Sequence, residues 1–260
     1  MKQFNEAELK ILKENYRLTI ASNPSPLSIK VIELTNEIQL SEYLLKVRER
    51  IEAANLMVAA SLFVKRYSFA VLSALYSMSV WNKRLNFSLE NVSLETLDEE
   101  DVFWLPSFKL HELSVEEAAD GNRLPWRDSV LQHIFSNHVD VLFTHIIKVC
   151  KLTKLIMWEN LYVYVCWMYE KLLNDTSLSH IHHQIQEDFQ YILKTAPGHL
   201  FGSYHRNPFL RYDKANSKNK AEDQDTRVRQ TCCFAYLTAM KGQHCKICPV
   251  SCRRRQAGEK

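Results

Sequence analysis

Five of the seven cysteines fall within 21 consecutive positions, and this crowding is the strongest constraint on what the chain can fold into. They are Cys232, Cys233, Cys245, Cys248 and Cys252. A chain of 260 residues can bury a sizeable core, so the cysteines are not needed to hold a miniature fold together. In a reducing compartment, such cysteines are expected to bind a metal or to carry out redox chemistry rather than to form disulfides.

The spacing within this segment favours a two-iron cluster over a single zinc ion. Cys245-x-x-Cys248 can place two sulfurs on one metal, because the intervening turn bends the chain back on itself. Cys232 and Cys233 have no spacer, and the side chains of adjacent residues diverge. A [2Fe–2S] cluster has terminal positions on two irons and tolerates this spacing better. Zinc and free redox-active thiols remain alternatives, and Cys252 is either a spare thiol or a replacement ligand.

Positive charge is concentrated in the same part of the chain. Residues 227–260 carry eight Lys and Arg side chains against one acidic residue, a net charge of +7, whereas the other 226 residues carry a net charge of −4. Cations near a cluster with four thiolates favour its reduction. A basic tail also suits nucleic acid, but no aromatic stripe is interleaved with these charges, so we expect no nucleic-acid partner.

Glycine is scarce, with five residues in all, and no G-x-G-x-x-G or G-x-x-x-x-G-K-[ST] motif can be built from them. A nicotinamide or flavin site of the Rossmann type is therefore not expected, and electrons should come from a ferredoxin-like protein or a separate reductase. The first residues form no apolar signal region, and no apolar run approaches the roughly 18 residues of a membrane span. We expect a cytoplasmic protein without a transmembrane segment.

Hydrophobic periodicity predicts an α+β fold that is mainly α-helical, a helical bundle with a small antiparallel β section. Helices are expected over residues 6–20, 41–52 and 55–80, and again in blocks over residues 125–150, 151–173 and 179–194. The β section should cover residues 83–116. Three regions follow from this pattern: a mainly helical domain over residues 1–212, a polar linker over residues 213–226, and the cysteine-rich segment over residues 227–260.

Several polar or reactive side chains lie within the helical blocks and are expected to be structural. Lys65 and Arg66 interrupt an apolar stretch, which predicts a solvated stripe or a buried ion pair. Residues His180–His183 lack matching cysteine or carboxylate partners and read as a polar helix start. Cys150 and Cys166 lie among apolar residues and should be buried structural thiols.

The cysteine segment resembles the C-C-x10-C-x2-C motif of the FhuF-like ferric siderophore reductases. The motif maps onto Cys232, Cys233, Cys245 and Cys248, with a spacer of 11 residues, one longer than in that pattern. Two upstream stretches are also similar to this family and to the C-terminal domains of IucA/IucC-type siderophore synthetases. They are Trp158-Glu-Asn-Leu-Tyr-Val-Tyr-Val and Ala60-Ser-Leu-Phe-Val-Lys-Arg-Tyr67.

The resemblance implies a mainly helical fold with some β structure and a [2Fe–2S] cluster on the four cysteines. It implies a reductase that passes one electron to Fe(III) in a hydroxamate or citrate-hydroxamate siderophore, with no side chain acting as a catalytic acid or base. Aromatic and basic side chains are the candidates for binding the ferric siderophore: Tyr204, His205, Arg206, Arg211, Arg227, Arg229 and Lys246. The alternatives are a non-enzymatic, zinc- or cluster-stapled siderophore-binding protein, and an iron or redox sensor.

Overall fold

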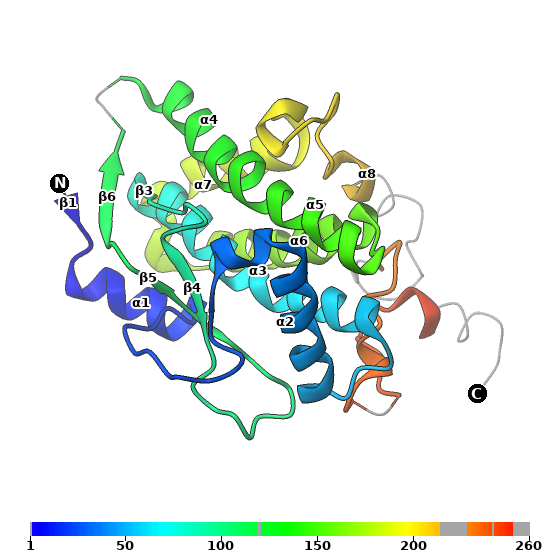
Figure 1. The fold of residues 1–260 in the computed structure, drawn as a ribbon. Helices are drawn as coiled ribbons and strands as arrows, with labels where there is room; N and C mark the ends of the chain where they lie inside the picture. The colour runs from blue at the N-terminus through cyan, green and yellow to red at the C-terminus, as the bar shows by residue number, and fades with distance from the viewer. Residues whose placement is uncertain (1, 119–120, 214–227, 241, 252–260) are drawn as a thin grey trace.

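Helices account for most of the fold, and a computed structural model describes them within residues 2–118, 121–213, 228–240 and 242–251 (Figure 1). The α-helices are α1 (Glu6–Tyr16), α2 (Glu37–Arg50), α3 (Leu56–Trp81), α4 (Arg123–Ile134), α5 (Asp140–Cys150), α6 (Lys154–Leu173), α7 (His182–Gln190) and α8 (Leu210–Asp213). Shorter 3-10 segments cover Val31–Thr35, Thr176–Ile181, Gly198–Phe201 and Ala235–Leu237, and π-helical turns cover Phe135–Val139 and Tyr191–Thr195. With two small antiparallel sheets, this confirms the predicted mainly helical α+β class.

Helix α3 is the central element of the core. It packs against α2 and α6, and most of its side chains are buried. The hydroxyls of buried Ser68, Ser73 and Ser77 donate to carbonyls within the helix, as in the bond from Ser77 to the carbonyl of Ser73 at 2.8 Å. By length and composition α3 would pass as a membrane span, but 72% of its most apolar window is buried inside the fold, as in core helices.

The ends of the first three helices show which local sequence signals set the helix boundaries. Asn5 and Glu8 form a capping box at the predicted start of α1, but the helix ends at Tyr16 rather than at residue 20, because Arg17 adopts a left-handed φ of 62°. The second helix begins before the predicted residue 41, because the Asn36 side chain accepts hydrogen bonds from the first turn and serves as the cap. Asn55 caps α3, which confirms the third prediction.

Two three-stranded sheets replace the single predicted β section. Strands β3 (Lys83–Leu85), β4 (Val92–Glu95), β5 (Ser107–Leu110) and β6 (Ser114–Glu117) lie in or close to the predicted range. Each sheet is completed by a two-residue strand from the N-terminal part of the chain, β1 (Lys2–Gln3) beside β6 and β2 (Ile29–Lys30) beside β4. Strands this short have no readable alternation, so only long-range pairing reveals them.

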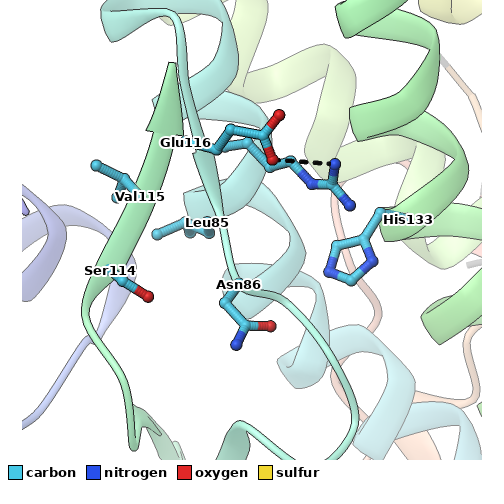
Figure 2. A pocket seen from close by; sticks show the side chains of 7 residues that line it. Leu85, Asn86, Ser114, Val115, Glu116 and His133 are labelled. Atoms are coloured by element: carbon cyan, nitrogen blue, oxygen red, sulfur yellow. Dashed lines mark hydrogen bonds and ion pairs between the residues drawn. The ribbon is translucent and has the colours of Figure 1, made fainter. Parts of the chain in front are cut away.

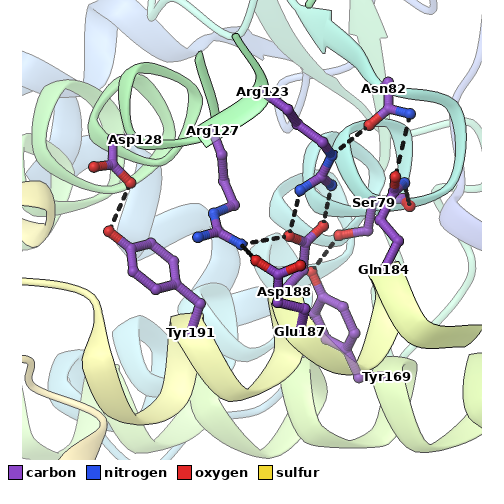
Figure 3. A network of polar contacts seen from close by, with 10 residues as sticks. All are labelled: Ser79, Asn82, Arg123, Arg127, Asp128, Tyr169, Gln184, Glu187, Asp188 and Tyr191. Atoms are coloured by element: carbon purple, nitrogen blue, oxygen red, sulfur yellow. Dashed lines mark hydrogen bonds and ion pairs between the residues drawn. The ribbon is translucent and has the colours of Figure 1, made fainter. Parts of the chain in front are cut away.

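A buried ion-pair network joins α4 to α7 (Figure 3). The Asp188 carboxylate is fully buried and accepts from Arg123 at 2.5 and 2.9 Å and from Arg127 at 3.0 Å. Arg127 also reaches Glu187 at 3.0 Å and stacks over the ring of Tyr191. Because two guanidiniums compensate one carboxylate, this network fixes α7 against the helical body.

The cysteine segment packs on the body at the opposite end of the molecule from β1 and β6 (Figure 1). Cys233 and Ala235 belong to the same hydrophobic core as α3 and α6. Of the predicted linker, only Asp213, the last residue of α8, lies within the described residues.

Candidate metal centre

A short stretch that is hydrogen-bonded to α6 leads into the first cysteine pair. The Glu159 carboxylate, 2% exposed, accepts from the backbone N–H of Gln230 at 2.5 Å and of Thr231 at 2.7 Å, and also from the Thr231 hydroxyl. Its Oε2 lies 3.8 Å from Nε of buried Arg229. A buried carboxylate needs such partners, so α6 holds residues 229–231 in one position just before Cys232.

Asn160, the next residue on α6, connects the first pair to α3. Its Nδ2 donates to the carbonyl and hydroxyl of Ser61 at 3.0 and 3.1 Å, and its Oδ1 accepts from Arg229 at 2.6 Å. The Ser61 hydroxyl in turn donates to the carbonyl of Cys233 at 3.0 Å. All of these side chains are buried, so two helices fix the backbone of Cys233.

The second pair forms a tight turn beside the first. The N–H of Cys248 donates to the carbonyl of Cys245 at 3.0 Å, and the N–H of Arg229 donates to the carbonyl of Ile247 at 3.1 Å. His244 Nδ1 lies 3.3 Å from Cys248 Sγ. The bond between Arg229 and Ile247 therefore brings the two cysteine pairs together across a long interval of sequence.

The spacer between the pairs is anchored to the turn that joins α2 and α3. Ala54 donates its N–H to the carbonyl of Leu237 at 3.0 Å, and Ala239 donates to the carbonyl of Ile51 at 2.9 Å. Phe234, directly after the adjacent cysteines, adopts a left-handed φ of 62° that turns the chain away. The spacer is thus part of the fold and not a free loop.

The four thiols lie close to one another. Their strongest interactions join Cys233 to Cys245 and Cys232 to Cys248, and weaker electrostatic interactions join Cys232 to Cys233 and Cys245 to Cys248. Cys233 and Cys248 are buried, whereas Cys232 and Cys245 are half-buried, and none of the four forms a disulfide. Each of the two stronger interactions therefore joins one cysteine of the adjacent Cys-Cys to one of the C-x-x-C turn.

Within the part of the chain that the structure describes, no three His, Cys, Asp or Glu side chains converge on a position that could hold one metal ion. The adjacent Cys-Cys and the C-x-x-C turn together supply four thiols, a donor type that both zinc and iron–sulfur centres use. Cys252, the possible replacement ligand, lies outside the described residues.

Positive charge on the body stabilises one thiolate of this group. The pKa of Cys233 is lowered to about 5, because the Cys245 thiol donates to it and because Lys65 and Arg229 are close. The Lys65 Nζ lies 4.0 Å from Cys233 Sγ. Burial and the neighbouring thiols raise the pKa of Cys232 to about 11. The metal-free site therefore favours one anionic sulfur, on Cys233.

Of the residues predicted to bind substrate, Tyr204 has a structural role. Its hydroxyl accepts from Trp158 Nε1 at 2.9 Å and donates to Asp140 at 2.8 Å. The loop is pressed against Gly198, where a Cβ would lie 2.3 Å from the carbonyl oxygen of Tyr204. His205 and Arg206, which follow, have exposed side chains.

The other predicted substrate-binding residues do not form one surface. Arg211 is exposed, and its carbonyl accepts from Gln230 Nε2 at 2.7 Å, so only its backbone is tied to the cysteine segment. Arg229 is buried against α6, and Lys246 is exposed beside the C-x-x-C turn. Arg227 lies outside the described residues, as do Lys241 and Arg253–Arg255.

The residues that support the cysteines were not singled out by the sequence. Lys65 was expected in a solvated stripe or a buried ion pair, but within the described residues it forms no ion pair and faces Cys233 instead. Ser61, Glu159 and Asn160 are further supports. The available signal was their position, because they fall in the two upstream stretches that resemble the reductase family.

The two remaining cysteines lie away from this centre. Cys166 is buried, and Cys150 is half-buried and donates to the carbonyl of Ile146 at 3.1 Å. Burial raises the pKa of the Cys150 thiol, which keeps it protonated. His182, in the predicted polar helix start, bonds the carbonyl of Asp175 at 2.9 Å.

An open pocket of about 400 Å³ lies at the other end of the fold, between β3, β6 and α4 (Figure 2). Arg84 lines it and is paired with Glu116 at 3.4 Å. His133 accepts from the N–H of Phe87 at 3.1 Å, and burial lowers its pKa. Arg84 and His133 therefore already have partners within the fold.

The chain was compared with models of known protein families, with curated proteins and with solved structures, and none of them matches it.

Proposed function

We propose that this protein is a one-electron reductase of ferric siderophores, with a [2Fe–2S] cluster held by Cys232, Cys233, Cys245 and Cys248. The observation that carries the proposal is the close approach of the four thiols, two from each half of the motif. Two thiolates on each of two irons is the donor arrangement of a [2Fe–2S] cluster.

The cluster, when bound, supplies reversible one-electron chemistry. Hard hydroxamate and carboxylate oxygens hold Fe(III) more strongly than Fe(II). One electron, taken from an external donor protein, therefore converts Fe(III) in the chelate to Fe(II) and loosens the iron. No bond between carbon atoms changes, and no proton transfer by a side chain is needed.

The chain itself has three tasks in this reaction. The hydrogen bonds of Glu159, Asn160 and Ser61 hold the cysteine backbone rigid, which limits rearrangement when the charge changes. Lys65 and Arg229 stabilise negative charge at the thiolates. The half-buried Cys232 and Cys245 leave an edge of the site accessible to donor and chelate, while Cys233 and Cys248 shield the other side.

A zinc-stapled binding protein is the second candidate, and the proximity of His244 to Cys248, at 3.3 Å, favours it. A Cys and His donor set is common for structural zinc. Such a protein would bind a ferric siderophore without reducing it.

Anaerobic purification followed by iron, sulfide and zinc analysis distinguishes the two. We expect a coloured protein whose visible bands bleach with dithionite and return when ferric siderophore is added. Cys232→Ser, Cys233→Ser, Cys245→Ser and Cys248→Ser should each remove the colour. Cys150→Ser is the matched control, since it removes a thiol outside the site. A colourless protein with one zinc per chain would overturn the reductase.

A further inference from the structure

Two arginine side chains, Arg17 and Arg66, lie near each other at α3. The Arg17 guanidinium lies over the ring of Phe69, with its Cζ 4.1 Å from the ring centroid. The Arg66 Cζ lies 5.6 Å from the ring centroid of Trp104. Both guanidiniums interact electrostatically with Tyr164, and they lie close enough to repel each other.

Neither guanidinium has a partner for its charge within the described residues. The Nη1 atoms of Arg17 and Arg66 are buried and have no hydrogen-bond acceptor, and neither side chain forms an ion pair there. Asp101 is the nearest carboxylate, but its oxygens accept from the N–H groups of Phe103 and Leu105 at 2.9 and 3.0 Å. Arg17 and Arg66 are half-buried with unpaired Nη1 atoms, so together they offer two positive charges and free donors to an anionic ligand.

Burial lowers the pKa of the Arg66 guanidinium to about 10, and repulsion by the Arg17 guanidinium also lowers it. Burial also lowers the pKa of Arg17. Both groups remain charged at neutral pH, so an anionic ligand meets two full positive charges.

The arginine pair lies along the same two helices that support the cysteines. Lys65, which faces Cys233, directly precedes Arg66 on α3, and adjacent helical residues point about 100° apart. On α6, Tyr164 follows Asn160 by one turn, and its ring packs 5.3 Å from that of Phe69. Phe69, which lies under Arg17, is one helical turn from Lys65 on α3, so the arginines follow the residues that support Cys233 along the same two helices.

We propose that Arg17 and Arg66 bind carboxylate groups of the ferric chelate, so that the substrate class is a carboxylate-bearing siderophore of net negative charge. This proposal rests on the reductase function. A guanidinium presents parallel N–H donors that match the two oxygens of a carboxylate. Lys65 adds a third positive charge between this site and the cysteines, and a cationic hydroxamate chelate would be repelled by all three.

Binding can be measured without electron transfer by replacing Fe(III) with Ga(III), which is not reduced under these conditions. Isothermal titration calorimetry of the full chain with gallium(III) citrate should show binding, whereas the cationic gallium complex of desferrioxamine B should show much weaker binding. Arg17→Gln and Arg66→Gln should each weaken citrate-complex binding by about ten-fold, the loss of one charge-assisted contact. Lys13→Gln, which removes an exposed charge from α1, is the matched control.

Thermal unfolding separates a ligand site from a structural role. Because each arginine is unpaired, Arg66→Gln should melt at or above the temperature of the parent protein while it loses binding. A salt titration of the unchanged protein gives an independent readout, because binding should weaken as salt screens the charges.

The proposal is overturned if both arginine variants bind gallium citrate as tightly as Lys13→Gln, or if binding to the unchanged protein is insensitive to salt. If the arginine variants reduce ferric siderophore and bind the gallium complex as the unchanged protein does, the carboxylate site is contradicted but the reductase function is not. If binding depends on the arginines but no reduction depends on the cysteines, the reductase function is contradicted but the binding site is not.

Discussion

The Nζ of Lys65 lies 4.0 Å from the Sγ of Cys233, although 168 positions separate the two residues in the chain. This contact joins the central helix to the motif that carries the cysteines. It also brings a cation from the body of the protein, rather than from the basic tail, to the most acidic thiol of the site.

Lys65→Met should lower the reduction potential of the metal site. The ammonium favours the more negative, reduced state, so its removal makes reduction harder. A loss of about 1 kcal/mol of charge stabilisation corresponds to roughly 40 mV for a one-electron couple. Potentiometric titration followed by visible absorption measures the shift, with Lys13→Met as the control for a change in net charge. Equal potentials in the two variants would contradict the role assigned to Lys65.

Glu159→Gln should release the first cysteine pair from α6. The variant leaves Arg229 as a buried cation without its carboxylate and weakens the acceptor for Gln230 and Thr231. Breaking such a buried pair costs about 3–5 kcal/mol. Iron content should fall while far-ultraviolet circular dichroism shows that the helices persist.

The double variant Glu159→Gln/Arg229→Met tests the coupling directly. It removes the buried charge as well as its partner, so its loss of stability should be smaller than the sum of the two single losses. Additive losses would mean that the two side chains act independently.

Asp188→Asn should lower the free energy of unfolding by about 3–5 kcal/mol, because it leaves Arg123 and Arg127 without their shared carboxylate. Glu187→Gln provides a matched control on the same helix. The Glu187 side chain is 47% exposed, so its loss should cost less than about 1 kcal/mol. Urea unfolding followed by circular dichroism measures the free energy of unfolding of both variants. Similar losses in the two would show that burial does not determine how much each carboxylate stabilises the fold.

His138 should make the fold sensitive to acid. It is fully buried between the hydroxyl of Tyr67 and the carbonyl of Phe87, and burial lowers its pKa to about 3. In the unfolded chain its pKa is near 6.5, so below that pH the unfolded state binds a proton that the folded state does not. Stability should therefore fall by about 2 kcal/mol between neutral pH and pH 5 from this residue alone.

Urea unfolding at the two pH values checks this expectation. His138→Gln should reduce the difference in stability between them, even if the variant is less stable at both. His183→Gln, which changes an exposed histidine, should leave the difference as it is. An unchanged difference in His138→Gln would show that other groups cause the acid sensitivity.

Local signals in the sequence predicted much of the secondary structure. The Asn5 and Glu8 capping box and the Asn55 cap depend on hydrogen bonds that span only three residues, so both were readable. The predicted start of α2 at residue 41 was wrong because Asn36, whose own backbone is extended, accepts hydrogen bonds from the N–H groups of Ile38 and Gln39 and caps the helix earlier. The pairing of β1 with β6 crosses more than a hundred residues and leaves no local pattern.

The sequence by itself determined the helical blocks, and it predicted the donor set of Cys232, Cys233, Cys245 and Cys248, with Cys252 as a possible alternative. Only the tertiary structure decided that Cys233 pairs with Cys245 and Cys232 with Cys248, and that Lys65 faces them. It also turned Arg229 into a buried support and brought Arg17 to Arg66. Spacing and propensity act over a few residues, whereas these contacts close long loops and form only when the helices pack around a common core.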